Sequence, residues 1–176
     1  MTRYVALLRG VNVGGITVRS ARLAEMARGM GLDDVRTVLA SGNLVFSSDE
    51  PVERLKTRIE SELSDTFGYD AWIVLTTSAH VAQVVAAYPF EPDREGHHAY
   101  VVFGSHPGVL AELTAEATSV VGTSGADEQV APGDGVLYWE CPKGSTLDTA
   151  VSKVLARKAY RQSTTNRNLR TLRKLT

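Results

Sequence analysis

The order of apolar and amphipathic segments in the first half of the chain limits the fold more than any other feature. A short apolar run at residues 4–9 is typical of a buried strand, and residues 19–30 carry the apolar stripe of a helix. Residues 35–40 and 44–47 predict two strands joined by Ser41-Gly42-Asn43, which is hairpin-turn chemistry. A helix over residues 51–67 and a strand at 71–75 complete the order β-α-β-β-α-β, and another helix at 77–88 follows. This order is the split-βαβ or ferredoxin-like arrangement.

The second half of the chain partly repeats this pattern. Residues 99–103 predict a strand, 107–117 a helix, 128–131 and 136–141 a hairpin, and 149–159 a helix. Residues 167–175 predict a basic helix where a last strand would stand, so the second unit is expected to be incomplete. We therefore predict an α+β protein with two ferredoxin-like units (alpha-beta plaits) over residues 1–89 and 97–176, joined by a linker at 90–96. A single mixed sheet is the alternative.

Composition narrows the class of protein. Hydrophobic residues make up 43% and charged residues 22% of the chain, which are values typical of a globular protein. No apolar stretch approaches the roughly 18 residues that a membrane helix needs, and the N-terminus lacks the pattern of a signal peptide. The chain has a single cysteine, Cys141, and therefore no internal disulfide. These features lead us to expect a cytoplasmic protein that does not interact with membranes.

The charge of the chain is strongly asymmetric. The chain has 19 basic and 20 acidic residues, and residues 149–176 hold eight of the basic ones and no acid. The preceding residues therefore carry 11 basic and 20 acidic groups, a net charge of −9. Either the tail packs on the acidic body, or it meets an anion such as phosphate or nucleic acid. Apolar residues at 169, 172 and 175 give the tail a face to bury, which favours packing.

Topology brings two polar corners of the first unit together. The first and second strands of a split βαβ run parallel and the third runs antiparallel, so the end of the first strand and the hairpin lie at one sheet edge. The first helix also begins there, and its N-terminus has a partial positive charge. This edge gathers hydrogen-bond donors suited to a phosphate or carboxylate. The candidate anion-binding residues are Arg9, Asn12, Gly14, Gly15, Ser41 and Asn43.

A structural role explains the same residues equally well. Asn12 and the two glycines can supply left-handed backbone, Asn43 can cap the hairpin, and Arg9 can pair with an acid. The loop does not match the glycine pattern of a dinucleotide or P-loop site, and we expect no cofactor. The adjacent His97 and His98 are expected to face solvent, and no metal site is predicted. The sequence leaves open whether the protein is an enzyme.

Three segments carry a resemblance to a known family. The runs LLRGVNVGG at residues 7–15, ASGNLVF at 40–46 and TTNRNLRTLRKL at 164–175 resemble the bacterial family catalogued as domain of unknown function 1697. The resemblance implies two ferredoxin-like units in a bacterial cytoplasmic protein and implies no activity. The usual ending of the family resembles Arg-Asn-Trp-Asn-Thr. Arg167, Asn168 and Thr171 match it here, while Leu169 replaces the Trp and Arg170 the second Asn.

Three functions are consistent with these features. The first is binding of a small anion or phosphorylated metabolite at the corner of Arg9, Asn12, Ser41 and Asn43. The second is association with nucleic acid through the basic tail, with Arg167, Asn168 and Arg170 as candidates. The third is a structural or interaction role in which the tail packs on the acidic body. We favour the first, and the sequence does not indicate an oligomeric state.

Overall fold

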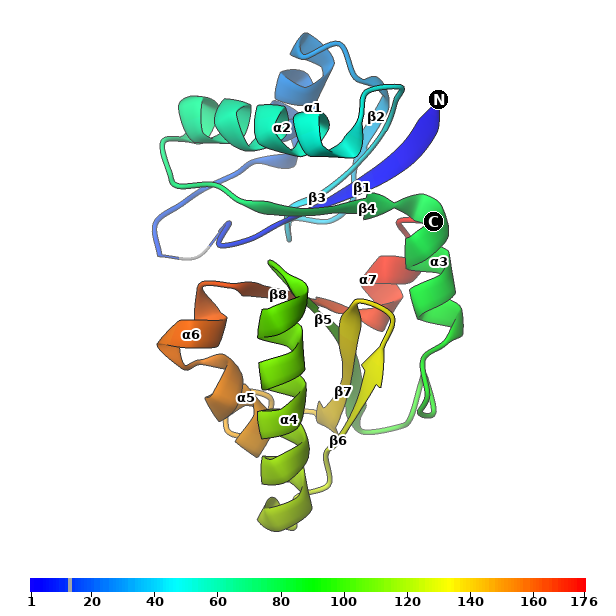
Figure 1. The fold of residues 1–176 in the computed structure, drawn as a ribbon, viewed down its shortest axis with the longest axis vertical. Coiled ribbons are helices and arrows are strands. Elements are labelled where there is room, and N and C mark those ends of the chain that lie inside the picture. Colours follow the sequence, from blue (N-terminus) through cyan, green and yellow to red (C-terminus); the bar gives the residue numbers. More distant parts are fainter. Residues whose placement is uncertain (13) are drawn as a thin grey trace. The chain divides into compact units, whose positions relative to one another are not determined.

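The computed structural model describes residues 1–12 and 14–176, and it shows two four-stranded antiparallel sheets, each with helices (Figure 1). The expected α+β class is confirmed. The chain divides into two units, which are described separately below. Unit 1 comprises Met1–Ala82 together with Arg173–Thr176, and unit 2 comprises Gln83–Leu172. The stretch predicted as a linker, residues 90–96, lies within unit 2 in this division.

Unit 1 contains the predicted β-α-β-β-α-β order, and its strands lie in the order β2-β3-β1-β4. Every neighbouring pair is antiparallel. Its elements are β1 (Thr2–Leu8), α1 (Ser20–Gly29), β2 (Asp33–Thr37), β3 (Asn43–Ser48), α2 (Val52–Phe67) and β4 (Ile73–Thr77). The helix α3 (Ser78–Ala86) follows β4 and crosses the division between the units.

The core of unit 1 lies between the sheet and its two helices, which cover one face (Figure 1). Successive residues of a strand point to opposite faces, and on β1 the residues Tyr4, Ala6 and Leu8 contribute to this core. The helix α2 packs on this core through Leu55, Ile59 and Leu63, which lie on one face of the helix. Gly68 ends α2 in the left-handed conformation that glycine adopts without strain.

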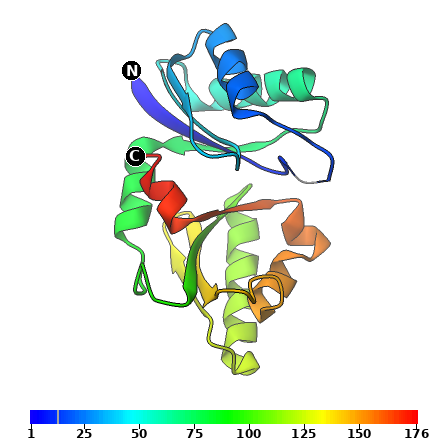
Figure 2. The same cartoon turned by 180° about the vertical axis from the view of Figure 1, so that it is seen from behind.

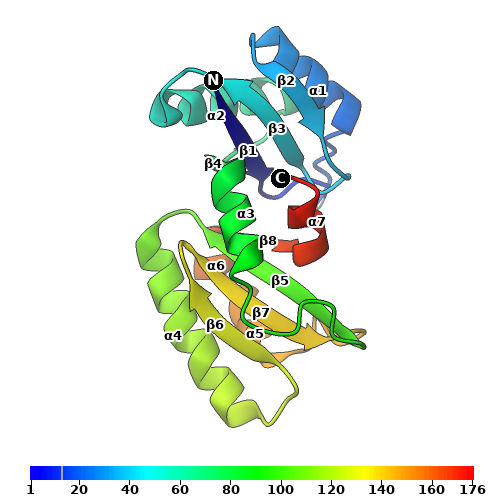
Figure 3. The ribbon, with the colours of Figure 1, turned by 90° about the vertical axis from the view of Figure 1, so that its right-hand side faces the viewer.

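Unit 2 has the same strand order as unit 1, namely β6-β7-β5-β8 (Figure 3). Its elements are β5 (His97–Gly104), α4 (Pro107–Ser124), β6 (Gln129–Gly133), β7 (Val136–Pro142), α5 (Ala150–Leu155), α6 (Lys158–Arg161), β8 (Thr164–Asn168) and α7 (Leu169–Arg173). Its core joins β5 and β7 to α4 and α5, with Trp139, Leu113 and Val154 among the buried residues. The indole N–H of Trp139 donates to the buried carboxylate of Glu128 at 3.1 Å.

The tail differs from the sequence prediction, because it contributes a last strand to unit 2. β8 pairs antiparallel with β5 along Thr164–Asn168, and Figure 2 shows the two strands side by side. The second unit is therefore a complete β-α-β-β-α-β unit, and the prediction of an incomplete copy was wrong. Of the basic helix predicted over residues 167–175, the segment Leu169–Arg173 is helical, as α7. The leucine spacing suggested a longer helix, but the preceding polar segment gains a full ladder of hydrogen bonds by pairing with β5.

The last four residues belong to unit 1 and are fixed there through their backbone. Arg36 on β2 donates to the carbonyl of Lys174 at 3.0 Å, and the hydroxyl of Ser78 donates to the carbonyl of Leu175 at 3.2 Å. The side chain of Leu175 is fully buried.

In the described part of the chain, no helix combines the length and hydropathy needed to span a bilayer.

We expect Leu175→Ala to lower the free energy of unfolding by about 2–5 kcal/mol, because it truncates a fully buried side chain. Urea unfolding monitored by circular dichroism measures this change. The exposed neighbour supplies the control, since Lys174→Ala leaves the backbone hydrogen bond to Arg36 in place. Equal unfolding midpoints for the two variants would show that the end of the chain does not stabilise the fold.

Candidate functional site

The two polar corners of unit 1 meet at one end of its sheet. In the antiparallel pairing of β1 with β3, Leu7 lies opposite Asn43. The backbone N–H of Leu8 then donates to the carbonyl of Gly42 at 2.8 Å. The loop that follows β1 and the turn between β2 and β3 are therefore adjacent. This arrangement brings the candidate residues Arg9, Asn12, Ser41 and Asn43 to the same corner.

Asn12 fastens the loop after β1 to the hairpin turn. Its side-chain amide donates to the carbonyl of Ala40, and its side-chain oxygen accepts from the backbone N–H of Val18 at 3.1 Å. Its own N–H donates to the carbonyl of Ile16 at 2.7 Å. The residue has a φ of 58°, a left-handed conformation that asparagine tolerates better than most residues. The amide of Asn12 is therefore engaged in closing the corner.

Asn43 closes the hairpin turn from inside. The side chain is fully buried, and its amide donates to the carbonyl of Val38 and to the hydroxyl of Ser41, both at 2.8 Å. Removing one partner of a buried hydrogen bond lowers the stability of a protein, because the other polar group is left buried and unsatisfied. Asn43 thus supports the turn, and Ser41 serves as one of its acceptors.

The remaining candidates at this corner are the two glycines and Arg9. Gly14 and Gly15 are exposed, with φ values of 61° and 87°, which glycine adopts without strain. Arg9 is half-buried directly after β1. Gly42 is the tightest position, since an added Cβ would lie 2.6 Å from Cγ2 of Val11 and 2.9 Å from Cβ of Leu8. The corner is packed closely enough to require a glycine at its centre.

We expect Asn43→Ala to lower the free energy of unfolding by about 1–3 kcal/mol, because it removes a fully buried amide and leaves the partly buried carbonyl of Val38 without this donor. Chemical denaturation measures the change. Ser41→Ala is the matched control, since Ser41 is exposed and its loss leaves the bond from Asn43 to Val38 intact. A destabilisation by Asn43→Ala no larger than that by Ser41→Ala would contradict the structural role of Asn43.

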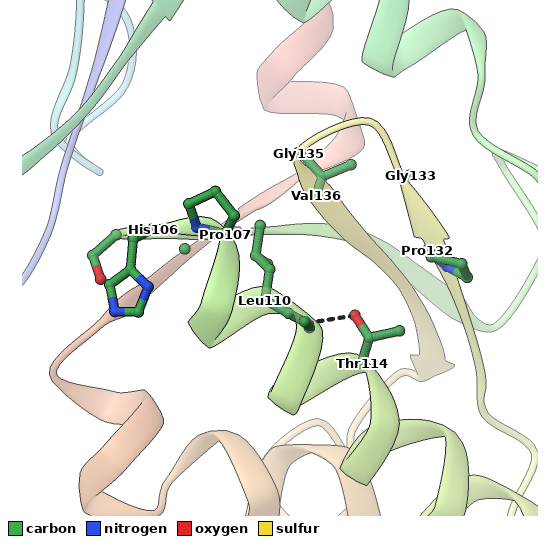
Figure 4. A pocket seen from close by; sticks show the side chains of 11 residues that line it. His106, Pro107, Leu110, Thr114, Pro132, Gly133, Gly135 and Val136 are labelled. Atoms are coloured by element: carbon green, nitrogen blue, oxygen red, sulfur yellow. Dashed lines mark hydrogen bonds between the residues drawn. The ribbon is translucent and has the colours of Figure 1, made fainter.

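The equivalent corner of unit 2 is open, and it forms a cavity of about 530 Å³. The cavity lies at the end of β5, beside the start of α4 and the turn of the β6–β7 hairpin. One wall is formed by α4, with Leu110 and Thr114, and the opposite wall by the hairpin, with Pro132 and Val136 (Figure 4). Gly133 and Gly135 line it on the hairpin side. Ligand pockets in proteins commonly have volumes of about 300–1,000 Å³. The sequence did not reveal this site, because most of its lining residues are apolar or glycine.

The polar groups of this cavity lie at the start of α4. The backbone N–H of Val109 donates to Nδ1 of His106 at 3.3 Å, so His106 is the N-cap of the helix. The hydroxyl of Thr114 donates to the carbonyl of Leu110 within the helix at 2.6 Å (Figure 4). The eleven residues that line the cavity include no Asp, Glu, Lys or Arg.

The tail candidates are held by contacts within unit 2. Arg167 lies on β8, where its guanidinium donates to the hydroxyl of Thr165 at 2.7 Å and to the carbonyl of Asn166 at 2.8 Å. Burial lowers the pKa of Arg167 to about 10. The side chain of Asn168 accepts from the N–H of Arg170 at 2.9 Å. Arg170 also lies 3.4 Å from the carboxylate of Asp93, and both side chains are exposed.

A charged cluster connects the predicted linker to the sheet of unit 2. Arg94 contacts the carboxylate of Asp127 at 3.0 Å and the buried carboxylate of Glu140 at 2.9 Å. Nε2 of His97 lies 2.9 Å from Asp127, and this hydrogen bond, assisted by Arg94, lowers the pKa of that carboxyl group. His97 is therefore part of β5 and paired, whereas we expected it to face solvent. Among the described residues, no group of His, Cys, Asp and Glu side chains is arranged to hold a metal ion.

Residues 1–138 match the model of a family described as "Protein of unknown function (DUF1697)". The chain belongs to this family. This confirms the resemblance expected from the sequence. The terminal motif at residues 164–175 lies beyond the matched residues.

The solved structures that match this family member include two that cover almost the whole chain. The conserved bacterial protein SP0830 from Streptococcus pneumoniae is 25% identical, with a TM-score of 0.80 over 99% of this chain and 96% of that chain. An unknown protein from Galdieria sulphuraria is 16% identical, with a TM-score of 0.28 over 95% of this chain and 96% of that chain. No curated protein matches the chain.

Proposed function

We propose that this protein binds a small molecule that carries an anionic group, and that the binding site is the cavity of unit 2. The observation that carries the proposal is the contrast between two equivalent corners. In unit 1 the corner is closed by the side chains of Asn12 and Asn43. In unit 2 the corresponding corner leaves a solvent-open cavity of about 530 Å³.

The equivalence of the two corners rests on topology. Both units have the order β-α-β-β-α-β and the same strand order, which supports a ferredoxin-like fold for each. In unit 1 the corner is formed by the loop from β1 to α1 and the turn between β2 and β3. In unit 2 it is formed by the loop from β5 to α4 and the turn between β6 and β7, where Phe103 pairs with Val136.

An anion site at Arg9, Asn12, Ser41 and Asn43 remains the alternative position for the same function. It would depend on Arg9 and on the backbone of Gly14 and Gly15, because the amides of Asn12 and Asn43 already donate to carbonyls of the turn. The cavity of unit 2 is favoured because it offers the volume that a small molecule needs.

For the tail, the contacts favour a structural role over binding of nucleic acid. The guanidinium of Arg157 contacts Glu116, that of Arg170 contacts Asp93, and Arg167 is buried on β8. The backbone of the last residues is hydrogen-bonded within unit 1. Two of these guanidinium groups are therefore paired with carboxylates and one is buried. Fewer cationic side chains of the tail are then available to bind the phosphates of a nucleic acid.

A thermal-shift screen with carboxylic acids, nucleotides and sugar phosphates tests the proposal, because a ligand that binds only the native state raises its melting temperature. We expect Ala111→Phe, which adds a ring to a residue of the lining, to abolish the shift given by any hit. Ala115→Phe is the matched control, since Ala115 is exposed on the same helix and does not line the cavity.

The same screen on Arg9→Ala distinguishes the two corners. We expect the shift to persist in this variant. A shift that disappears with Arg9→Ala and persists with Ala111→Phe would move the site to unit 1. A screen in which no compound shifts the wild-type protein would contradict the proposed function.

A further inference from the structure

We infer that the ligand of the unit 2 cavity carries a branched aliphatic group, and that this group takes the place that the side chains of Leu8 and Val11 take in the equivalent corner of unit 1. This inference rests on the proposed function, which places the ligand site in that cavity. It adds the chemical class of the apolar part of the ligand. The support comes from the residues that stand at equivalent positions of the two units.

Strand register makes the two units comparable residue by residue. The two central strands of each sheet carry a stacked pair of rings on the face that the helices cover. In unit 1, Tyr4 on β1 lies opposite Phe46 on β3, with ring centroids 5.7 Å apart. In unit 2, Tyr100 on β5 lies opposite Trp139 on β7, with ring centroids 5.1 Å apart. Positions in β1 and β5 can therefore be matched by counting from these two tyrosines.

The end of this first strand holds a large side chain in unit 1 and none in unit 2. Four residues after the stacked tyrosine, unit 1 has Leu8, whose side chain is buried in the core. At the same position unit 2 has Gly104, which lines the cavity. An added Cβ at Gly104 would lie 2.8 Å from Cγ of Leu110, so this leucine of α4 packs on the glycine. The corner of unit 2 thus lacks one leucine side chain that the corner of unit 1 has.

The loop after the first strand supplies a second apolar side chain in unit 1 alone. There the loop comprises residues 9–19, and Val11 within it is buried against the hairpin turn. An added Cβ at Gly42 of that turn would lie 2.6 Å from Cγ2 of Val11. In unit 2 the loop is reduced to Ser105 and His106, which are both exposed. This short loop has no side chain that corresponds to Val11.

The walls of the cavity suit the groups that are missing from it. The apolar side chains of the lining are Pro107, Leu110, Ala111, Pro132 and Val136 (Figure 4). An isobutyl or isopropyl group placed between them removes apolar surface from water and requires no hydrogen bond. The hydroxyl groups of a sugar or a nucleoside would lose bonds to water against these walls. Because the cavity is open to solvent, the anionic group of the ligand can stay hydrated at its mouth.

Titration calorimetry with two series of probes tests the inference, and each series keeps one anionic group constant. The carboxylates are 4-methylpentanoate, phenylacetate and gluconate, and the phosphates are 3-methylbutyl phosphate, phenyl phosphate and ribose 5-phosphate. In at least one series we expect the branched probe to bind about tenfold more tightly than the sugar-like one, as burial of a few aliphatic carbons produces. We also expect it to bind more tightly than the aromatic probe. Binding of the branched probe no tighter than that of the other two, in both series, overturns the inference.

Two glycine-to-alanine variants test where the aliphatic group lies. We expect Gly104→Ala to weaken binding of the branched probe severalfold, because the added methyl group restores the first carbon of the side chain that unit 1 has there. Gly122→Ala is the matched control, since an added Cβ at Gly122 meets nothing within 4 Å and this residue of α4 does not line the cavity. Circular dichroism checks that both variants are folded. Equal binding by the two variants overturns the placement beside Gly104.

Ala111→Phe separates failure of the inference from failure of the proposed site. If the sugar-like or aromatic probe binds most tightly and Ala111→Phe abolishes that binding, the aliphatic preference is overturned and the site is retained. Binding that Ala111→Phe leaves unchanged overturns both, as does the absence of binding by every probe.

Discussion

The antiparallel pairing of β1 with β3 is the constraint on which the first corner depends. It places the end of β1 beside the hairpin turn, where Leu8 donates to the carbonyl of Gly42. The close approach leaves no room for a Cβ at Gly42, since Val11 already occupies that space. Once the two backbones meet in this way, the polar groups of both loops need partners, because buried backbone groups are costly when unpaired. Asn12 and Asn43 provide these partners.

The same topology has a different outcome in unit 2. There β5 ends at Gly104 and the hairpin turn carries Gly133 and Gly135, so no side-chain amide bridges the two segments. Gly133 is still required by packing, because an added Cβ would lie 2.5 Å from the ring of Tyr138. Space therefore remains between α4 and the hairpin. We attribute the closed corner of unit 1 to the side chains of Asn12 and Asn43, and the open corner of unit 2 to the glycines that stand in its loop and hairpin turn.

Much of the fold could be predicted from the sequence, because most elements have a clear apolar period. The α2 stripe of Leu55, Ile59 and Leu63 is an example, and all three side chains are buried. The segment that became β8 has no such period. Thr164–Asn168 is polar throughout. Its Arg167 is buried, whereas arginine side chains are mostly exposed in folded proteins. Its pairing with β5 is a tertiary effect that local sequence does not encode.

The candidate site was harder to predict than the fold. Topology indicated that the two polar corners of unit 1 meet, and the register of Leu7 with Asn43 agrees. Whether an amide donates to a ligand or to its own turn depends on side-chain placement, which the sequence does not show. The residues 90–96 were similarly ambiguous, since their polar character concealed the contact of Arg94 with the buried Glu140. The cavity of unit 2 could not be predicted from the sequence, because glycine and proline between two strands are typical of a turn and do not indicate a pocket.

The central claim is that the open corner of unit 2, and not the closed corner of unit 1, holds the ligand. Two-dimensional 1H–15N NMR during titration with 4-methylpentanoate tests it most directly, because backbone amides report binding residue by residue. If the unit 2 corner holds the ligand, the largest chemical-shift changes fall at residues 104–114 and 133–136. Changes concentrated at residues 8–16 and 40–43, with the unit 2 corner unaffected, would contradict it.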